Sequence, residues 1–385
     1  MTDRIVSRAG RSAWVVALAV AGCSGSMPLK WQKVESSSTG LRGSVLGLDS
    51  PGTFDEVGNF TVTAFKENGV TSLYYGGADA TGKTICPNSP AFYASHWRIG
   101  LAQSSDGVNF TRVPGSETGG AIVDLGAPGA FDSYLTYRPY VLPDGATYRM
   151  WYNGATMPFN DCNAPAGQNP LALDRRIGYA ESTDGVHWTK FYDGAGPGGS
   201  VLPLGAAGAI DAQQVGYMWV IKDEGQYKMY YSANDATNTW RVALAVSSDA
   251  RHWTKVPGPN ANGSVLDIGP PGAFDVACAY QPSVVKDPSG LYRMWYRGCQ
   301  APSPLGGPSQ GVIGYAESWD GLHFVKVNAG LSQGEALDKG AAGQFDSGGL
   351  TTPSVFLDGS TWNMYYAGFD ASVNYLAGLA RAPAN

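Results

Sequence analysis

The chain has 385 residues, of which 26 are Lys or Arg and 32 are Asp or Glu, so its formal net charge at pH 7 is −6. The basic residues do not gather into a stripe, which excludes the usual electrostatic signature of a nucleic-acid-binding surface. Beyond the first 22 residues, no apolar run reaches the roughly 18 residues that a membrane-spanning helix needs.

The first 22 residues have the pattern of an export signal. Three arginines precede a short apolar stretch over 14–21, a combination typical of a signal peptide. The stretch ends in Val-Ala-Gly-Cys, which resembles the lipobox of bacterial lipoproteins, where the cysteine is acylated. The alternative is an ordinary signal peptide followed by an unrelated cysteine. We expect a signal peptide over 1–22, lipidation of Cys23, a short linker over 23–30, and export to a bacterial outer membrane, cell surface or periplasm.

After the linker, the chain repeats one pattern five times. Each repeat opens on a phrase of a small residue, Gly, any residue, an apolar residue and Asp. The five aspartates are Asp55, Asp132, Asp211, Asp275 and Asp346. They are spaced by 77, 79, 64 and 71 residues. Such a period in a strand-rich chain indicates one supersecondary unit used repeatedly.

Each repeat predicts four strands. In the second repeat they are expected around 138–141, 148–152, 177–182 and 187–190, where β-branched and aromatic residues are typical of pleated, half-buried strands. The third and fourth strands are separated by Asp-Gly at 184–185. This dipeptide is a strong hairpin signal, because both turn positions need a positive φ.

The last repeat lacks a fourth strand, because the chain stops after a third strand at 376–381. Residues 31–34 match the fourth strand at 252–256, so we expect the N-terminal strand to complete the last unit. This closure removes open sheet edges. The sequence therefore predicts an all-β fold over 31–385, a five-bladed β-propeller with four antiparallel strands per blade. The alternative, an open array of hairpins, gives no reason to move one strand to the front.

Four cysteines follow Cys23, an even number in an exported chain, which favours disulfides. Cys278 and Cys299 are expected to face each other across one hairpin and to form a disulfide. Cys86 and Cys162 follow the second strands of neighbouring repeats, so their loops share one face, and we expect them to form the second disulfide. A metal site is the rival interpretation. Three of the four histidines occupy one repeated position, away from any cysteine in the pattern, so we expect no metal and no cofactor.

The repeated pattern resembles a known superfamily. Proline in the first strand, Met-Trp-Tyr in the second, Ile-Gly-Tyr-Ala-x-Ser in the third and Asp-Gly-x-x-Trp after it are similar to five-bladed glycoside hydrolases of families 43 and 32. These are arabinanases, xylosidases and fructosidases, with levansucrases and β-mannoside phosphorylases nearby. The resemblance covers 31–385. It implies a carbohydrate ligand at the mouth of the central channel and catalysis by paired carboxylates.

The resemblance also points to candidate catalytic residues. Several members place an aspartate just before the first-strand proline. The equivalent positions here hold Thr61, Arg138, Tyr217, Gln281 and Thr352. Because none is a carboxylate, the catalytic candidates become the repeated aspartates, above all Asp55, Asp132 and Asp275. The alternative is that all five repeated aspartates are structural, since Asp readily caps turns.

Non-repeated channel residues are the candidates for ligand binding, because aromatic rings with nearby polar donors suit sugar faces and hydroxyls. They are Tyr137, Arg138, Tyr217, Tyr280 and Gln281. The alternative for this set is plain packing around a narrow channel. Three aspartates that follow second strands, in the first, third and fifth repeats, are added as further candidates: Asp79, Asp235 and Asp370.

These features predict a protein that acts on or binds extracellular glycans, and glycosidase is the enzyme activity that the resemblance implies. The alternative is a non-catalytic cell-surface propeller that binds glycan or protein. We expect a monomer that takes a carbohydrate ligand, has no nucleic-acid partner and touches the membrane only through its lipid anchor.

Overall fold

The computed structural model describes residues 29–36, 42–86, 94–158, 173–300, 311–331, 333–370, 372 and 375–384. Within these ranges the regular structure is strand apart from one short helix, α1 (Thr81–Ile85), and two single-turn 3₁₀ segments. The predicted signal peptide, the lipidated Cys23 and most of the linker lie outside the described residues.

The strands form five units of four antiparallel strands each. The first unit contains β2 (Gly58–Glu67), β3 (Val70–Ala78), β4 (Trp97–Ser104) and β5 (Thr111–Val113). The second contains β6 (Leu135–Asp144), β7 (Thr147–Ala155), β8 (Arg176–Ser182) and β9 (Thr189–Phe191). The third contains β10 (Gln214–Asp223), β11 (Gln226–Asn234), β12 (Trp240–Ser247) and β13 (Thr254–Val256). The fourth contains β14 (Cys278–Lys286), β15 (Tyr292–Cys299), β16 (Gly311–Ser318) and β17 (Val325–Lys326). The fifth contains β18 (Gly349–Asp358), β19 (Thr361–Phe369), β20 (Tyr375–Pro383) and β1 (Gln32–Val34).

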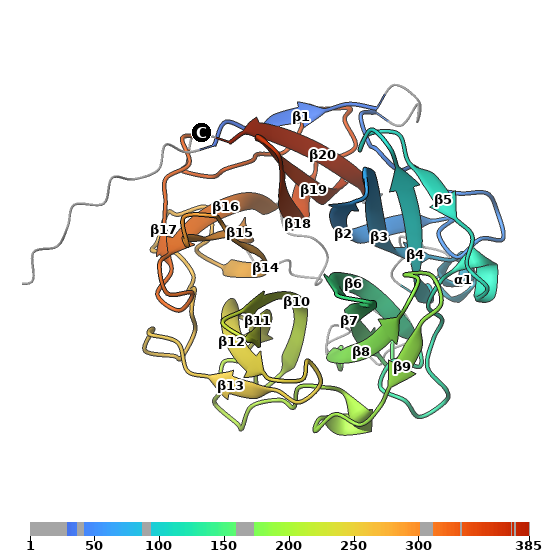
Figure 1. Cartoon of the computed structure of the whole chain (residues 1–385), viewed down its shortest axis with the longest axis horizontal. Coiled ribbons are helices and arrows are strands. Elements are labelled where there is room, and N and C mark those ends of the chain that lie inside the picture. The colour runs from blue at the N-terminus through green and yellow to red at the C-terminus, as the bar shows by residue number, and fades with distance from the viewer. Residues whose placement is uncertain are drawn as a thin grey trace, which may run out of the picture.

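The five units stand around a common centre. Figure 1 shows the first strand of each unit, β2, β6, β10, β14 and β18, nearest that centre, and the fourth strands at the rim. Single parallel bridges, Trp97 to Leu135 and Trp240 to Cys278, join the first unit to the second and the third to the fourth, giving two eight-stranded sheets. The strand-rich prediction is confirmed: the described fold is all-β, with four antiparallel strands in each repeat.

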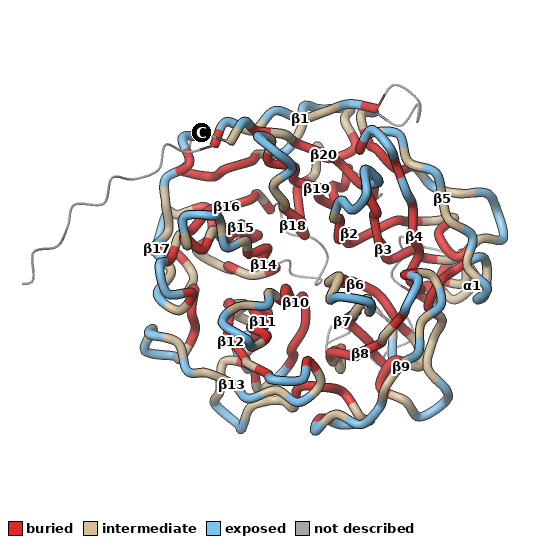
Figure 2. Tube along the Cα trace, viewed as in Figure 1, coloured by how far each residue is buried: buried red, intermediate tan, exposed pale blue. Residues whose placement is uncertain are grey.

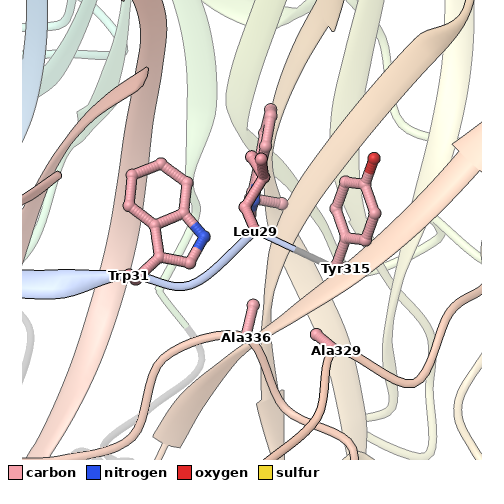
Figure 3. Close-up of a pocket in the computed structure, with 6 residues that line it drawn as sticks. Leu29, Trp31, Tyr315, Ala329 and Ala336 are labelled. Atoms are coloured by element: carbon pink, nitrogen blue, oxygen red, sulfur yellow. The ribbon is translucent and has the colours of Figure 1, made fainter. Parts of the chain in front are cut away.

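The N-terminal strand completes the fifth unit. Gln32, Lys33 and Val34 pair with Arg381, Ala380 and Leu379 in antiparallel register, which confirms the expected pairing. The residues just before β1 also reach the fourth unit: Trp31 meets Trp295 edge-on, with ring centroids 6.0 Å apart. Figure 3 shows Leu29 and Trp31 over Tyr315 and two alanines of that unit. The N-terminal segment therefore ties two units together.

Aromatic residues of the second strands hold neighbouring units together. Tyr74 Oη donates to the carbonyl of Gly185 over 3.0 Å, and Tyr365 Oη donates to that of Gly107 over 2.6 Å. In each case the acceptor lies in the Asp-Gly turn of the next unit. Trp151 and Tyr230 make the equivalent bonds to Ala250 and Gly321. These contacts explain why both the aromatic strand and the turn recur in the sequence.

Glycines of the second and third strands make room for the opening phrase in four of the five repeats. A Cβ on Gly154 would lie 2.5 Å from Asp132 Cβ and 2.6 Å from Phe131 Cε2, and a Cβ on Gly178 would lie 2.7 Å from Phe131 Cζ. The phrase thus seats its Phe and Asp directly on the second and third strands of its own unit. Figure 2 shows the strands largely buried, with the exposed residues in the loops and hairpin turns.

The predicted bond between Cys278 and Cys299 is confirmed. The two residues pair across the β14–β15 hairpin with Cα atoms 5.1 Å apart and form a disulfide. The bond predicted between Cys86 and Cys162 stays a prediction, because Cys162 lies outside the described residues.

Candidate functional site

Each innermost strand carries a β-bulge at the same place in its unit. The strand register slips there in all five units. One residue at each bulge has a left-handed backbone, with φ between 48° and 64°: Thr61, Arg138, Tyr217, Gln281 and Thr352. Left-handed non-glycine residues are uncommon, and both bulges and such backbone strain concentrate at functional sites, where they re-aim a side chain. Five strained positions therefore face one another around the centre.

A set of cationic and aromatic side chains surrounds these bulges on the side of the second, third and fourth units. We call it the central cluster, and it consists of Tyr137, Arg138, Arg175, Tyr217, Trp240, Tyr280 and Arg297. The guanidinium of Arg138 lies 5.1 Å from the ring centroid of Tyr217, and that of Arg175 lies 4.5 Å from the same ring. Tyr217 in turn meets Tyr280 at 5.7 Å. The structure thus brings together four of the predicted binding residues, and the fifth, Gln281, follows Tyr280 in β14.

Hydrogen bonds fix two of the arginines within the central cluster. Arg175 donates through Nε to Tyr137 Oη over 2.6 Å and through Nη1 to Gln214 Oε1 over 2.7 Å. Arg297 donates through Nη1 to Tyr280 Oη over 2.6 Å. Burial raises the pKa of Tyr137 and of Tyr280, so both phenols stay neutral at physiological pH. Burial also lowers the pKa of Arg138 to about 9, which still leaves it charged at pH 7.

Gln281 links the central cluster to the fifth unit. Its Oε1 accepts hydrogen bonds from the Thr351 hydroxyl and, over 3.0 Å, from the Thr352 backbone N–H. Its own backbone N–H donates to Ser232 Oγ over 2.9 Å. These bonds hold the Gln281 side chain in one orientation, with its oxygen turned toward β18.

The repeated aspartates, including the catalytic candidates Asp55, Asp132 and Asp275, are buried in ion pairs. Asp132 is 0% exposed, accepts from Tyr152 Oη over 2.9 Å and lies 2.7 Å from Lys190 Nζ. The other four units repeat the arrangement with the trios Asp55–Tyr75–Arg112, Asp211–Tyr231–Lys255, Asp275–Tyr296–Lys326 and Asp346–Tyr366–Lys33. This geometry favours a structural role over contact with a substrate. A catalytic role for the three candidates stays a prediction.

The aspartates that follow the second strands are also paired. Asp79 Oδ2 lies 2.9 Å from Arg98 Nη1, and Asp235 Oδ2 lies 2.6 Å from Arg241 Nη1. Each arginine also binds a second aspartate in its own unit, so the two sites are structural equivalents. Burial alone would raise the pKa of Asp79, but hydrogen bonds from His96, Thr81 and Arg98 lower it to about 2. The carboxylate is therefore a permanent anion.

Asp370 occupies the equivalent place in the fifth unit, where its Oδ2 accepts from Arg42 Nη1 over 3.0 Å. Asp79 differs from the other two in its surroundings. It lines an open cavity of about 350 Å³, together with Glu56, Thr81, Arg98 and Thr118. The cavity lies between the loop that leads into β2 and the helix α1 that follows β3.

Sequence reasoning did not single out Arg175 and Arg297. The residue that follows the paired aromatics of the second strand is Gly76, Asn153, Ser232, Arg297 or Ala367 in the five units. Arg297 is the one charged residue in that position, which is a signal that the sequence carries. Arg175 directly precedes β8 and adjoins Arg176. Arg176 occupies the position at which the first and third repeats have Arg98 and Arg241, so the repeat pattern pointed to Arg176 and not to Arg175.

Within the described ranges, no group of three His, Cys, Asp or Glu side chains is placed to hold a metal ion. The same ranges contain no helix of the length and apolar character needed to cross a membrane.

Comparisons with known proteins show a shared fold but do not assign the chain to a family. No family model matches the chain. It is 28% identical over 214 residues to Uncharacterized protein Rv1502 of Mycobacterium tuberculosis (strain ATCC 25618 / H37Rv), and equally to Uncharacterized protein MT1551 of strain CDC 1551 / Oshkosh. The match covers 55% of this chain and 59% of each relative. The chain thus spans about three fifths of the length of these curated relatives.

Several solved structures with a similar fold carry the names of glycoside hydrolases. A structure from the GH130 family of mannoside phosphorylases has a TM-score of 0.63 at 16% identity, covering 94% of this chain and 97% of that one. A family 117 glycoside hydrolase from the marine bacterium Zobellia galactanivorans has a TM-score of 0.60 at 13% identity, covering 93% and 92%. A further glycoside hydrolase has 0.63 at 14%, covering 87% and 90%. At these identities the likeness shows a shared fold.

Proposed function

We propose that this protein is a five-bladed β-propeller that acts on or binds a glycan at the mouth of its central channel. The observation that carries the proposal is the central cluster, where the rings of Tyr217, Trp240 and Tyr280 pack against guanidinium groups. Aromatic rings with a few placed polar groups are typical of small-molecule sites. The arrangement of five four-stranded units around one centre supports the propeller, and the shared fold with glycoside hydrolases supports a carbohydrate ligand.

Glycosidase activity is the first form of this function. Hydrolysis needs two carboxyl groups about 5–10 Å apart that flank the scissile bond. The shared fold supports this form, because one similar structure comes from the GH130 family of mannoside phosphorylases, which contains glycoside hydrolases that target beta-1,2 mannosidic linkages. To act in hydrolysis, the catalytic candidates Asp55, Asp132 and Asp275 would each have to break an ion pair.

A binding protein without catalysis is the second form, and a specific observation favours it. The five bulged positions hold no carboxylate, and each repeated aspartate is paired with a Lys or Arg of a fourth strand. A site built this way could hold a sugar without cleaving it.

One experiment separates the two forms. The purified protein is assayed against aryl glycosides, plant and bacterial polysaccharides and β-mannosides, with and without inorganic phosphate, and is applied in parallel to a glycan array. Turnover supports the enzyme, and binding without turnover supports the second form. Tyr280→Ala should abolish either signal, whereas Trp319→Ala, which removes a side chain that is 70% exposed, should leave both unchanged. A protein that neither binds nor turns over any glycan would contradict the proposal.

We further propose that the chain is exported and held at a bacterial membrane by lipid on Cys23, and that it is a monomer. The disulfide between Cys278 and Cys299 supports export, because such bonds persist in oxidising compartments. Cys23→Ser should move the protein from the membrane fraction to the soluble fraction. Intact-mass analysis after alkylation without reductant should find no free thiol, as a Cys86–Cys162 bond requires, and light scattering should give one chain per particle.

A further inference from the structure

The central cluster contains buried positive charge without a carboxylate partner. Arg138 is 2% exposed and Arg175 is 5% exposed, and within the described part of the chain neither forms an ion pair with Asp or Glu. Arg175 is held by a phenol and an amide, and Arg138 lies over the face of Tyr217. Burying a cation is costly unless it is paired. The arrangement is therefore the opposite of that around the repeated aspartates, each of which has its counter-ion.

Three buried polar atoms at the bulges also have no hydrogen-bond partner within the described ranges. They are Arg138 Nη1, Gln281 Nε2 and Thr352 Oγ1. Their residues are 2%, 1% and 0% exposed and occupy the equivalent bulged position in the second, fourth and fifth units. Buried donors in folded proteins are almost always satisfied. Each of these atoms can donate a hydrogen bond, and the cation among them favours an acceptor that carries negative charge.

The local structure makes room for these arginines. A Cβ on Gly216 would lie 2.5 Å from Arg175 Cδ, and a Cβ on Gly311 would lie 2.4 Å from Arg297 Nε. Glycine at these two positions lets the guanidinium groups enter. Arg138 has a left-handed backbone, with φ of 54°, as the residues at the other four bulges do. The charge is therefore built into the fold at several independent positions.

We propose that the central cluster binds the anionic substituent of an acidic glycan, such as the carboxylate of a uronic acid or a sulfate ester, and that Arg138 contacts the anion. This inference rests on the proposed function, because it names the class of glycan that the channel takes. A guanidinium presents N–H groups in a fork that matches carboxylate and other oxyanions. Trp240 and Tyr280 are only partly buried and supply the aromatic surface that the sugar would contact.

Calorimetric titration tests the proposal. Uronic-acid oligosaccharides, sulfated oligosaccharides and neutral oligosaccharides of the same length are compared, together with sodium glucuronate, sodium sulfate and inorganic phosphate as free anions. The acidic oligosaccharides should bind, and Arg138→Gln should weaken their binding by about tenfold to a hundredfold, the usual worth of a hydrogen bond to a charged group. Whether the uronic or the sulfated series binds more tightly identifies the source of the anion.

Glutamine is a suitable replacement because Gln281 already occupies the equivalent bulge with φ of 56°. Arg251→Gln is the matched control, since Arg251 lies in the turn before β13, at the rim, and pairs with Asp193. That control should leave binding unchanged. If Arg138→Gln does not fold, Arg138→Lys keeps the charge but loses the fork, and it should bind the acidic oligosaccharide more weakly than the parent while still responding to it.

A stability measurement separates a binding role from a structural one. Without ligand, Arg138→Gln should unfold at the same or a higher temperature than the parent, because it removes an unpaired buried charge. A clear fall in the unfolding temperature, together with unchanged binding, would overturn the proposal. The parent should be stabilised by acidic ligands, because a ligand that binds the folded state raises the unfolding temperature.

The outcomes also separate this inference from the proposed function. Equal binding of neutral and acidic oligosaccharides, insensitive to Arg138→Gln, overturns the anionic site and leaves glycan binding intact. Binding of free anions through Arg138 without binding of any oligosaccharide supports the anionic site and overturns the glycan function. Failure of every ligand to bind overturns both.

Discussion

Lys33 Nζ lies 2.6 Å from Asp346 Oδ2, although the two residues are 313 positions apart in the chain. Lys33 belongs to β1, and Asp346 belongs to the loop that leads into β18. In the other four units the basic partner of the repeated aspartate comes from the same repeat, as Lys190 does for Asp132. The N-terminal strand therefore supplies both the missing strand and the missing counter-ion of the fifth unit.

Removing this counter-ion should destabilise the whole ring. In Lys33→Met, Asp346 keeps its hydrogen bond from Tyr366 but becomes a fully buried, unpaired carboxylate. We expect the free energy of unfolding to fall by roughly 3 kcal/mol, as for other buried pairs that lose one member. Chemical denaturation monitored by circular dichroism measures the change.

Lys66→Met is the control for this substitution. Lys66 pairs with Asp358 over 2.7 Å, but both side chains are substantially exposed, and exposed pairs contribute about 0–1 kcal/mol. Equal losses in the two variants would show that the Lys33 pair has no special part in closing the ring.

High pH should unfold the protein through its buried tyrosines. Burial, with the neighbouring aspartate adding to it, raises the pKa of the tyrosines that donate to the repeated aspartates: Tyr75, Tyr152, Tyr231, Tyr296 and Tyr366. A raised folded pKa means that this stabilising contribution is complete below about pH 10 and is lost as the pH rises further, because only the unfolded chain releases the proton. Each tyrosine should lower the stability by about 1.4 kcal/mol per pH unit in that range.

Absorbance at 295 nm measures tyrosine ionisation and circular dichroism measures unfolding. The buried tyrosines should ionise together with the unfolding transition, whereas the chain in concentrated denaturant should ionise near pH 10. Full ionisation near pH 10 with the fold intact would contradict the burial described for these residues.

Much of the fold could be predicted because the strands of each repeat are marked by local sequence signals. Aromatic second strands and Asp-Gly turns are local signals, and Trp31 to Val34 matched a fourth strand closely enough to predict its pairing with 376–381, which β1 confirms. The lysine within that match was not recognised as the partner of Asp346. A contact between residues 313 positions apart depends on ring closure and leaves no local signal in a single repeat.

The site could be predicted only in part, because its chemistry depends on how the units meet. Tyr137, Arg138, Tyr217 and Tyr280 were found by their failure to repeat, and the structure brings them together. Arg175 was not predicted because it adjoins Arg176 in the repeated arginine position, and the space for its side chain depends on Gly216 of the next unit. The left-handed backbone of the five bulges was also not predicted, since threonine, arginine, tyrosine and glutamine rarely adopt it.

Loss of the confirmed disulfide should weaken the fourth unit. Replacing both Cys278 and Cys299 with serine opens a link between residues 21 positions apart, and bonds that close loops of this size typically contribute about 2–4 kcal/mol. The unfolding temperature of the double variant should fall, and reductant should lower the parent to the same value. A parent that is insensitive to reductant at its unfolding temperature would argue against this contribution.

The catalytic role predicted for Asp132 can be separated from its structural role by comparison with Asp211. Both are buried, both accept from a tyrosine, and both pair with a lysine at 2.6–2.7 Å, but Asp211 is not a catalytic candidate. Asp132→Asn and Asp211→Asn should therefore lower the free energy of unfolding by similar amounts, roughly 3 kcal/mol each, because each leaves a lysine without its counter-ion. Below the unfolding transition, both variants should bind glycan like the parent.

If Asp132 instead acts as an acid or base, Asp132→Asn alone should lower turnover by a factor of about 10² or more while the folded fraction stays high. If the two variants lose equal stability but only Asp132→Asn loses turnover, Asp132 is catalytic. If the two variants have equal stability losses and equal turnover, Asp132 is a structural residue of the ring.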